Sequence, residues 1–258
     1  MQSENVAAAG TPQLPPSLQA DHREFVQALS GTPGPERVDI HVLQLLTKFG
    51  LLVYEHADRL GLISKRDRST LFTRHVLDSL NPISLFDRPP ASVLDVGSGA
   101  GFPGIPLAAV WPSATVTLLE RRERKAGFLE RAARELGLRN AKVIPSRLED
   151  LAAGAHSRVH PDPRGPGFDD PREPGFDSVF IRALGSLPDL LGSLDPVCAP
   201  GARWVYFLGA GSSAEEILSG LGPLGLGASV ARGKFGGQLL HGCVKGVGRA
   251  HSEDASTA

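Results

Sequence analysis

A glycine-rich turn between a short apolar run and a predicted helix constrains the fold of this chain most. The apolar run is Ser92–Val96, and its short, partly β-branched pattern predicts a buried strand. Glycines follow at alternate positions, Gly97, Gly99 and Gly101, and Pro103 suits the first turn of a helix. Glycine lets a backbone approach a ligand closely, and a helix N-terminus offers N–H groups to it. The segment therefore predicts the ligand-binding edge of an α/β sheet.

Predicted strands and helices alternate after this turn. This alternation favours a doubly wound, mostly parallel sheet with helices on both faces. We expect an antiparallel pair at the end, from Ala228–Arg232 and Leu239–Val244. The remaining strands are predicted at Thr115–Glu120, Lys142–Pro145, Phe176–Ile181 and Arg203–Leu208, with helices at Glu123–Leu136 and Leu187–Val197.

A helical segment precedes the sheet. Apolar residues recur at helical spacing over residues 36–57 and again over 68–80, where Pro82 is expected to end the second helix. Residues 152–175 are rich in Pro, Gly, Asp and Arg, and we interpret them as a flexible insertion. The predicted organisation is a disordered tail at 1–20, a helical cap at 21–88, a sheet domain at 89–248 with the insertion at 152–175, and a disordered tail at 249–258.

Composition excludes several classes. The formal net charge of −1 is not that of a wholly basic nucleic-acid binder, so any RNA contact must come from a local patch. Two widely spaced cysteines, Cys198 and Cys243, predict neither a disulfide framework nor a metal site. The start of the chain lacks the pattern of a signal peptide, and no apolar run is long enough to span a bilayer. We therefore expect a cytoplasmic protein with no metal and no membrane contact.

Two acids near the glycine turn indicate the ligand. Glu120 ends the second predicted strand about 20 residues after the turn, where a carboxylate can accept hydrogen bonds from both ribose hydroxyls. This context fits a nicotinamide dinucleotide or S-adenosylmethionine. Asp95 lies inside the strand two residues before Gly97, and the spacing Gly97-x-Gly99-x-Gly101 is not that of a dinucleotide site. Both details favour S-adenosylmethionine as the cofactor, with Asp95 and the three glycines at its binding turn.

Residues after the third and fourth strands are the next candidates. Arg147, Leu148 and Glu149 would border the adenine, where Glu149 either accepts from the exocyclic amine or is a solvated acid at a helix start. Arg182 ends the fourth strand. Its planar fork suits the donor carboxylate, a target base or a phosphate, and the alternative is a surface ion pair. An Asn or Asp followed by two prolines, typical of enzymes that methylate exocyclic amines, is absent at Arg182.

A basic stretch follows Glu120. Arg121, Arg122 and Arg124 begin it, and arginine outnumbers lysine. A solvated helix face is one interpretation, and contact with a phosphate-rich substrate beside the donor pocket is the other.

Four stretches carry a resemblance to a known family. They are Arg74–Leu80, Leu94–Leu107, Ser146–Glu149 and Arg182–Leu187. In these residues the chain resembles the bacterial small-subunit ribosomal RNA guanine-N7 methyltransferases, once called glucose-inhibited division protein B. The runs Arg-His-x-x-Asp-Ser-Leu and Gly-Phe-Pro-Gly-Ile-Pro are specific to that family.

The resemblance implies a class I S-adenosylmethionine-dependent methyltransferase fold with a helical N-terminal cap. It implies methyl transfer to N7 of a guanine in the decoding region of 16S rRNA, with 16S rRNA or the small ribosomal subunit as partner. We expect a monomer. The residues that would touch the donor by position in the matched motifs are Gly97, Phe102, Leu148, Glu149 and Arg182, with Glu120 on the ribose.

Guanine N7 carries a lone pair and no proton, so this reaction needs no general base, and catalysis would rest on alignment and electrostatics. We hypothesise that Arg147 and Arg182 are the catalytic residues, orienting the base or flanking phosphates. His75 and Asp78 would brace the cap, with Arg74 beside them in the same motif.

The chain departs from the family pattern in three places. Gly61–Ile63 replaces the usual Asn-Leu-Thr, Gly209-Ala210 replaces a Lys-Gly pair, and the insertion is unusually long. The first two departures motivate one alternative, a donor-binding RNA module without activity. Two further alternatives stay open: a methyltransferase acting on a small molecule or protein, and a nicotinamide reductase.

Overall fold

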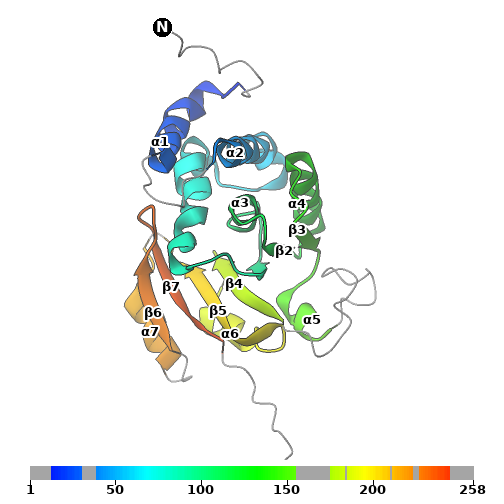
Figure 1. Ribbon diagram of the computed structural model, residues 1–258, viewed down its shortest axis with the longest axis vertical. Coiled ribbons are helices and arrows are strands. Elements are labelled where there is room, and N and C mark those ends of the chain that lie inside the picture. Colours follow the sequence, from blue (N-terminus) through cyan, green and yellow to red (C-terminus); the bar gives the residue numbers. More distant parts are fainter. Residues whose placement is uncertain are drawn as a thin grey trace, which may run out of the picture.

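The computed structural model describes residues 13–30, 39–154, 175–183, 185–209, 211–222 and 227–244. Seven strands of these residues form one sheet in the order β3-β2-β1-β4-β5-β7-β6 (Figure 1). Five strands are parallel, and β7 pairs antiparallel with both β5 and β6. This confirms the doubly wound, mostly parallel sheet with a terminal antiparallel pair. The strands are β1 Ser92–Val96, β2 Thr115–Leu119, β3 Ala141–Ile144, β4 Phe176–Arg182, β5 Cys198–Phe207, β6 Ala228–Arg232 and β7 Gln238–Cys243.

The central strand β1 determines where the site lies. Val96 at its end is in register with Leu119 of β2 and Ile181 of β4. Because these strands are parallel, the residues that follow them meet at one edge of the sheet. The strand order also changes direction between β1 and β4, which is the position where such sheets bind ligands.

Helices cover both faces of the sheet (Figure 1). Alternate residues of β1 face opposite sides, so Val93 packs in one apolar cluster and Leu94 in the other. The first cluster includes α2 Ile40–Leu60, α3 Gly104–Val110 and α4 Glu123–Leu136. The second includes α5 Leu148–Ala152, α6 Leu187–Gly192 and α7 Ala214–Leu221. The helix predicted over 187–197 is thus shorter than expected, and α5 and α7 were not predicted.

The N-terminal cap differs from the prediction at its start. A 3-10 turn, Pro16–Leu18, leads into α1, Gln19–Ser30, and Leu18 is fully buried. The expectation of disorder through residue 20 is therefore wrong for residues 16–20, because Leu18 and the apolar side of α1 pack against the rest of the cap.

The second cap helix was also predicted incorrectly. Residues 65–85 form three consecutive segments: η2, a 3-10 helix over Lys65–Thr70, η3, a π-helix over Phe72–Leu77, and η4, a 3-10 helix over Asp78–Leu85. The carboxylate of Asp21 accepts hydrogen bonds from the N–H groups of Phe72 and Thr73 at 2.6 and 3.1 Å, so these groups do not need α-helical partners. Pro82 lies inside η4, not after a helix end, because its fixed φ falls in the range of a 3-10 helix.

Residues 1–12, 31–38, 155–174, 223–226 and 245–258, together with Leu184 and Ala210, lie outside the described residues. Residues 1–12 of the predicted N-terminal tail, the whole predicted C-terminal tail and most of the predicted insertion fall there.

Candidate functional site

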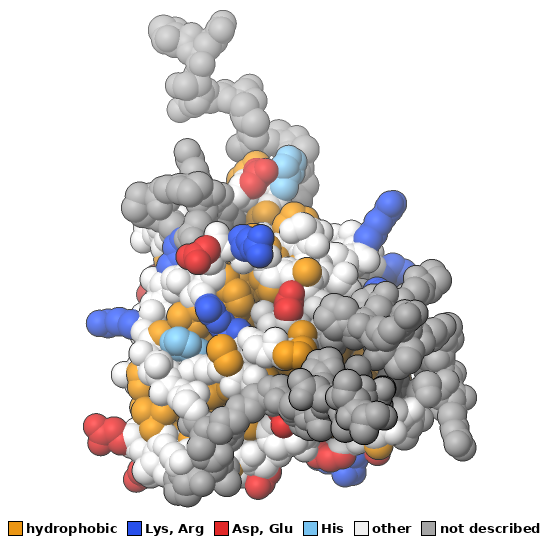
Figure 2. Space-filling view, turned by 60° about the horizontal axis from the view of Figure 1, so that its bottom comes forward, with side chains coloured by type: hydrophobic (Ala, Val, Ile, Leu, Met, Phe, Trp, Pro, Cys, Tyr) orange, Lys and Arg blue, Asp and Glu red, His pale blue; other side chains and the backbone are white. Residues whose placement is uncertain are grey.

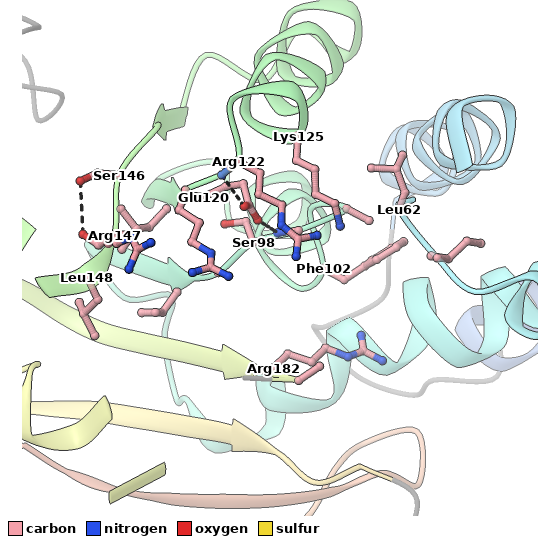
Figure 3. Close-up of a pocket in the computed structure, with 18 of the residues that line it drawn as sticks. Leu62, Ser98, Phe102, Glu120, Arg122, Lys125, Ser146, Arg147, Leu148 and Arg182 are labelled. Carbon is pink, nitrogen blue, oxygen red and sulfur yellow. Dashed lines mark hydrogen bonds between the residues drawn. The ribbon is translucent and has the colours of Figure 1, made fainter. Parts of the chain in front are cut away.

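A cavity of about 620 Å³ lies at the carboxyl edge of the central strands (Figure 3). Its walls come from the glycine turn after β1, the turns after β2 and β3, the end of β4 and the loop between α2 and η2. The predicted residues that line it are Gly97, Gly99, Phe102, Glu120, Arg121, Arg122, Arg147, Leu148, Glu149, Arg182 and His75. The predicted residues that do not line it are Asp95, Gly101, Arg74, Asp78 and Arg124.

The three glycines of the turn have positive φ angles, 69° at Gly97, 57° at Gly99 and 95° at Gly101. A Cβ at Gly99 would meet only the carbonyl oxygen of Gly97 within 4 Å, so this part of the turn is open to a ligand. A Cβ at Gly101 would lie 2.9 Å from Cγ1 of Ile105. The first two glycines therefore shape the cavity floor, whereas the third permits close packing behind it.

Glu120 is held against the turn. Its Oε2 accepts a hydrogen bond from the N–H of Gly99 at 2.9 Å, and its Oε1 accepts one from the N–H of Arg122 at 2.8 Å. The residue is 6% exposed and lines the cavity. Each carboxylate oxygen has a further lone pair, so the group can still accept two hydrogen bonds from a diol.

Asp95 lies beneath the turn and is fully buried. Its Oδ2 accepts a hydrogen bond from the N–H of Gly104 at 3.1 Å, and its Oδ1 has no partner among the described residues. Burial raises the pKa of Asp95 to about 7. The side chain thus ties β1 to the first residue of α3, which fixes the conformation of the turn from below.

The end of β3 supplies one side of the cavity. Leu148 is 4% exposed and, with Leu119 and Val96, gives this side an apolar wall. Arg147 and Glu149 flank Leu148, and Glu149 lies in the first turn of α5. An apolar wall with a carboxylate at its margin suits a purine, and Glu149 has also the position of an ordinary helix-start acid.

Arg182 points from the end of β4 toward the cap (Figure 3). Its Nη2 lies 2.7 Å from Oδ2 of Asp78 and donates to the carbonyl oxygen of Arg74 at 3.0 Å. Its Nη1 lies 3.4 Å from the carbonyl oxygen of His75 and from Oγ of Ser79. Among the described residues, the hydrogen bonds of this guanidinium are thus made by its two terminal nitrogens, and all go to the cap.

His75 and Phe102 join the cap to the glycine turn. Their rings stack with centroids 5.3 Å apart, and Phe102 also contacts Phe49 of α2 edge-on at 5.1 Å. Burial, and then the charge of Arg182, lower the pKa of His75 to about 4. The imidazole is therefore neutral near pH 7, which fits the predicted bracing role.

Basic side chains lie on one side of the cavity. Arg121, Arg122 and Lys125 line it, whereas Nη2 of Arg124 donates to the carbonyl oxygen of Arg59 at 3.3 Å. Figure 2 shows acidic, basic and apolar side chains interspersed on the face that it presents, as expected from the near-zero net charge. Arg121, Arg122 and Lys125 thus place three cations on the cavity wall.

Several residues that line the cavity were not predicted as site residues. Lys125 belongs to the basic stretch that follows Glu120, and it lies in the first turn of α4. Ser64 and Asp67 of the cap had no signal in the sequence, because only tertiary packing brings them to the cavity. Arg74, which was predicted in the cap motif with His75 and Asp78, lies in the cap and pairs with Asp67, with Nε 3.1 Å from Oδ1.

The first departure from the family pattern has a structural explanation. Gly61 ends α2 in the left-handed conformation, with φ 59° and ψ 46°. Glycine and asparagine adopt this conformation most readily, so glycine keeps the helix end that an asparagine would form. Leu62 and Ile63 then line the cavity. Gly209 is not among the lining residues.

None of the described helices combines the length and apolar character needed to cross a membrane. Within the same residues, no group of three or more His, Cys, Asp or Glu side chains is arranged to hold a metal ion.

The family model and the similar proteins indicate the same family. The family model of GidB, described as rRNA small subunit methyltransferase G, matches residues 42–219. The chain is 36% identical over 172 residues to ribosomal RNA small subunit methyltransferase G of Acidiphilium cryptum (strain JF-5), covering 66% of this chain and 70% of the relative. It is 47% identical over 161 residues to the protein of the same name from Solibacter usitatus (strain Ellin6076), covering 62% of this chain and 66% of that relative.

Solved structures share the fold. A methyltransferase from Geobacter sulfurreducens superposes with a TM-score of 0.51 at 15% identity, covering 86% of this chain and 96% of that one. The O-methyltransferase TomG from Streptomyces achromogenes, solved in complex with SAM, superposes with a TM-score of 0.50 at 17% identity, covering 89% and 99%. At such identities the likeness concerns the fold alone, which is that of S-adenosylmethionine-dependent methyltransferases.

Proposed function

Because the chain belongs to the GidB family of rRNA small subunit methyltransferases, we propose that it transfers a methyl group from S-adenosylmethionine to N7 of a guanine in the decoding region of 16S rRNA. The protein would act in the cytoplasm, as a monomer, on 16S rRNA or the small ribosomal subunit.

One observation carries the proposal: a buried carboxylate, Glu120, is fixed by hydrogen bonds beside an open, positive-φ glycine turn. This carboxylate and this turn suit a nucleoside derivative. The ribose offers two hydroxyl donors to the carboxylate, and the glycines let the ligand approach the backbone closely. When bound, S-adenosylmethionine supplies an electrophilic methyl group on a sulfonium.

The residues around the turn suit the rest of the donor. Leu119 and Leu148 give an apolar wall for the adenine, with Glu149 at its margin. Gly97 and Gly99 line the cavity with backbone only, and Gly99 leaves room for a ligand. Asp95 acts from below by fixing the turn, and it would stabilise the donor site without touching the donor.

The acceptor side follows from charge. Arg121, Arg122 and Lys125 give the cavity wall a positive potential that attracts an RNA backbone, and Arg147 extends it along the margin. Arg124 lies beside them and would add a peripheral phosphate contact. No proton has to leave guanine N7, so these cations would serve alignment and not base catalysis.

For Arg182 we propose that the side chain positions the cap at the cavity wall and does not bind a phosphate. Its terminal nitrogens bind cap atoms of Arg74, His75 and Asp78, so the side chain would hold the cap over the donor. The part of Arg182 that lines the cavity would face the donor.

A direct experiment tests the reaction. Small ribosomal subunits from a strain that lacks this protein are incubated with the pure chain and tritiated donor, and N7-methylguanine is mapped by chemical cleavage. The proposal expects label at one guanine of 16S rRNA. Donor binding without any label on the subunit or on naked 16S rRNA would reject it in favour of an inactive donor-binding module.

A further inference from the structure

We propose that Asn81 is a positioning residue, which holds Arg182 at the cavity wall through the carboxylate of Asp78. Asn81 is 1% exposed and lies in η4, away from the residues that line the cavity. The inference rests on the proposed function, because it concerns the donor site of that reaction.

The first step joins Arg182 to Asn81. Oδ2 of Asp78 lies 2.7 Å from Nη2 of Arg182, and Oδ1 of the same carboxylate accepts a hydrogen bond from Nδ2 of Asn81 at 2.6 Å. Each oxygen thus has its own partner on a different side. The carboxylate cannot rotate toward or away from Arg182 without losing the bond to Asn81.

The second step joins Asn81 to the turn between β6 and β7. Oδ1 of Asn81 accepts from the N–H of Phe235 at 2.6 Å, and its backbone carbonyl oxygen accepts from the N–H of Lys234 at 3.4 Å. Because the oxygen of the side-chain amide faces a backbone donor, its NH₂ group must face Asp78. The turn therefore fixes which way the amide donates.

Two glycines of this turn make room for the contact. A Cβ at Gly233 would lie 2.4 Å from Cβ of Asn81, and a Cβ at Gly237 would lie 2.4 Å from Nδ2 of Asn81 and 2.6 Å from Oδ1 of Asp78. Figure 1 shows the turn beside the helical segment that contains η4. The backbone of the turn is thus pressed against the two side chains that hold Arg182.

Loss of the amide would release one side of Asp78. Arg182 would then sample more orientations, and the cap atoms that it binds would no longer be held in one place over the donor. We therefore expect that replacing Asn81 weakens donor binding, although Asn81 touches neither the donor nor Arg182.

A double-mutant cycle tests this. The affinity for S-adenosylhomocysteine is measured by calorimetry in the full chain, in Asn81→Ala, in Arg182→Ala and in the double variant. Asn81→Ala is expected to weaken binding about tenfold when Arg182 is present, and less than about twofold when Arg182 is already replaced. An equal loss in both backgrounds, or no loss at all, would overturn the proposal.

A second variant perturbs Asn81 without removing it. Gly233→Ala adds a methyl group against Asn81, and it is expected to weaken donor binding as Asn81→Ala does. The matched control is Gly227→Ala at the other end of β6, where a Cβ meets nothing within 4 Å and affinity should not change. Melting temperatures identify variants that do not fold, and Gly233→Ala carries the test if Asn81→Ala is one of them. A folded Gly233→Ala with full donor affinity would contradict the proposal.

This assay needs no RNA. A wild-type chain that binds the donor but fails to methylate small subunits would reject the proposed reaction while the cycle still reports on Asn81. A cycle without coupling, in a chain that does methylate 16S rRNA, would reject only the positioning role.

Discussion

The carboxylate of Glu120 accepts a hydrogen bond from the N–H of Gly99 at 2.9 Å, and this contact joins the end of β2 to the turn after β1. The residues are 21 positions apart, yet both line the cavity. The carboxylate both shapes the turn and remains available to a ribose.

Replacing Glu120 should therefore weaken donor binding strongly. Glu120→Ala leaves the N–H groups of Gly99 and Arg122 without their acceptor and removes the ribose contact, so affinity for S-adenosylhomocysteine should fall about tenfold to hundredfold. Calorimetry measures this. Glu123→Ala, an exposed acid in the first turn of α4, is the control, and equal affinities in the two variants would contradict the assignment.

Gly104 should not tolerate a methyl group. A Cβ at Gly104 would lie 2.2 Å from Cδ2 of Leu118 and 2.6 Å from Oδ2 of Asp95, so Gly104→Ala should lower the free energy of unfolding by about 1–3 kcal/mol. Gly127→Ala in α4 meets nothing within 4 Å and should raise it by about 0.5–1 kcal/mol. Urea unfolding of both variants checks the pair, and a stable Gly104→Ala would refute the packing argument.

Stability should depend on pH through His75. Its pKa falls from 6.5 to about 4 on folding, mainly because of burial. Between these values the unfolded chain binds a proton that the folded chain does not, so this histidine makes the protein lose stability as the pH falls through the window. His75→Phe keeps a ring against Phe102. As the pH falls over that range, its free energy of unfolding should decrease by up to about 3 kcal/mol less than that of the wild type.

The wild type must be compared with His75→Phe because Asp95 changes stability with pH in the opposite direction. Its pKa rises from 3.8 to about 7 on folding, so its contribution to stability is lost as the pH rises. Both proteins retain Asp95, and the difference between their unfolding free energies isolates the histidine. Identical pH profiles would show that His75 is not held neutral.

The basic wall should contribute to RNA affinity in a salt-dependent way. Arg121→Gln and Arg122→Gln should each weaken binding to 16S rRNA and reduce the slope of log affinity against log salt by roughly 0.7–0.9. Filter binding over a range of salt concentrations measures the slope. Arg139→Gln, beyond the far end of α4, is the control, and a slope that changes as much in this variant would place the RNA elsewhere.

The glycine turn, Glu120 and the alternation of strands and helices could be predicted from the sequence because their signals are local. The turn follows its strand directly, and the acid follows the next strand. The predicted edge of the sheet is correct for the same reason.

Features that depend on distant contacts could not be predicted. The π-helix of η3 needs the carboxylate of Asp21, about 50 residues earlier, and no pattern within residues 72–77 reveals it. Arg182 was correctly placed at a strand end, but its terminal nitrogens bind atoms more than 100 residues away. Such pairings depend on packing of the whole cap against the sheet.

The turn between β6 and β7 comes late in the chain, whereas β1, β2 and β3 come early. During synthesis the ribosome therefore releases the glycine turn after β1 well before Gly233–Gly237. Asn81 therefore lacks its two backbone donors, the N–H groups of Lys234 and Phe235, until this turn has been synthesised. If Asn81 positions Arg182 as proposed, the contacts around Glu120 can form before those that fix Arg182, which depend on the β6–β7 turn.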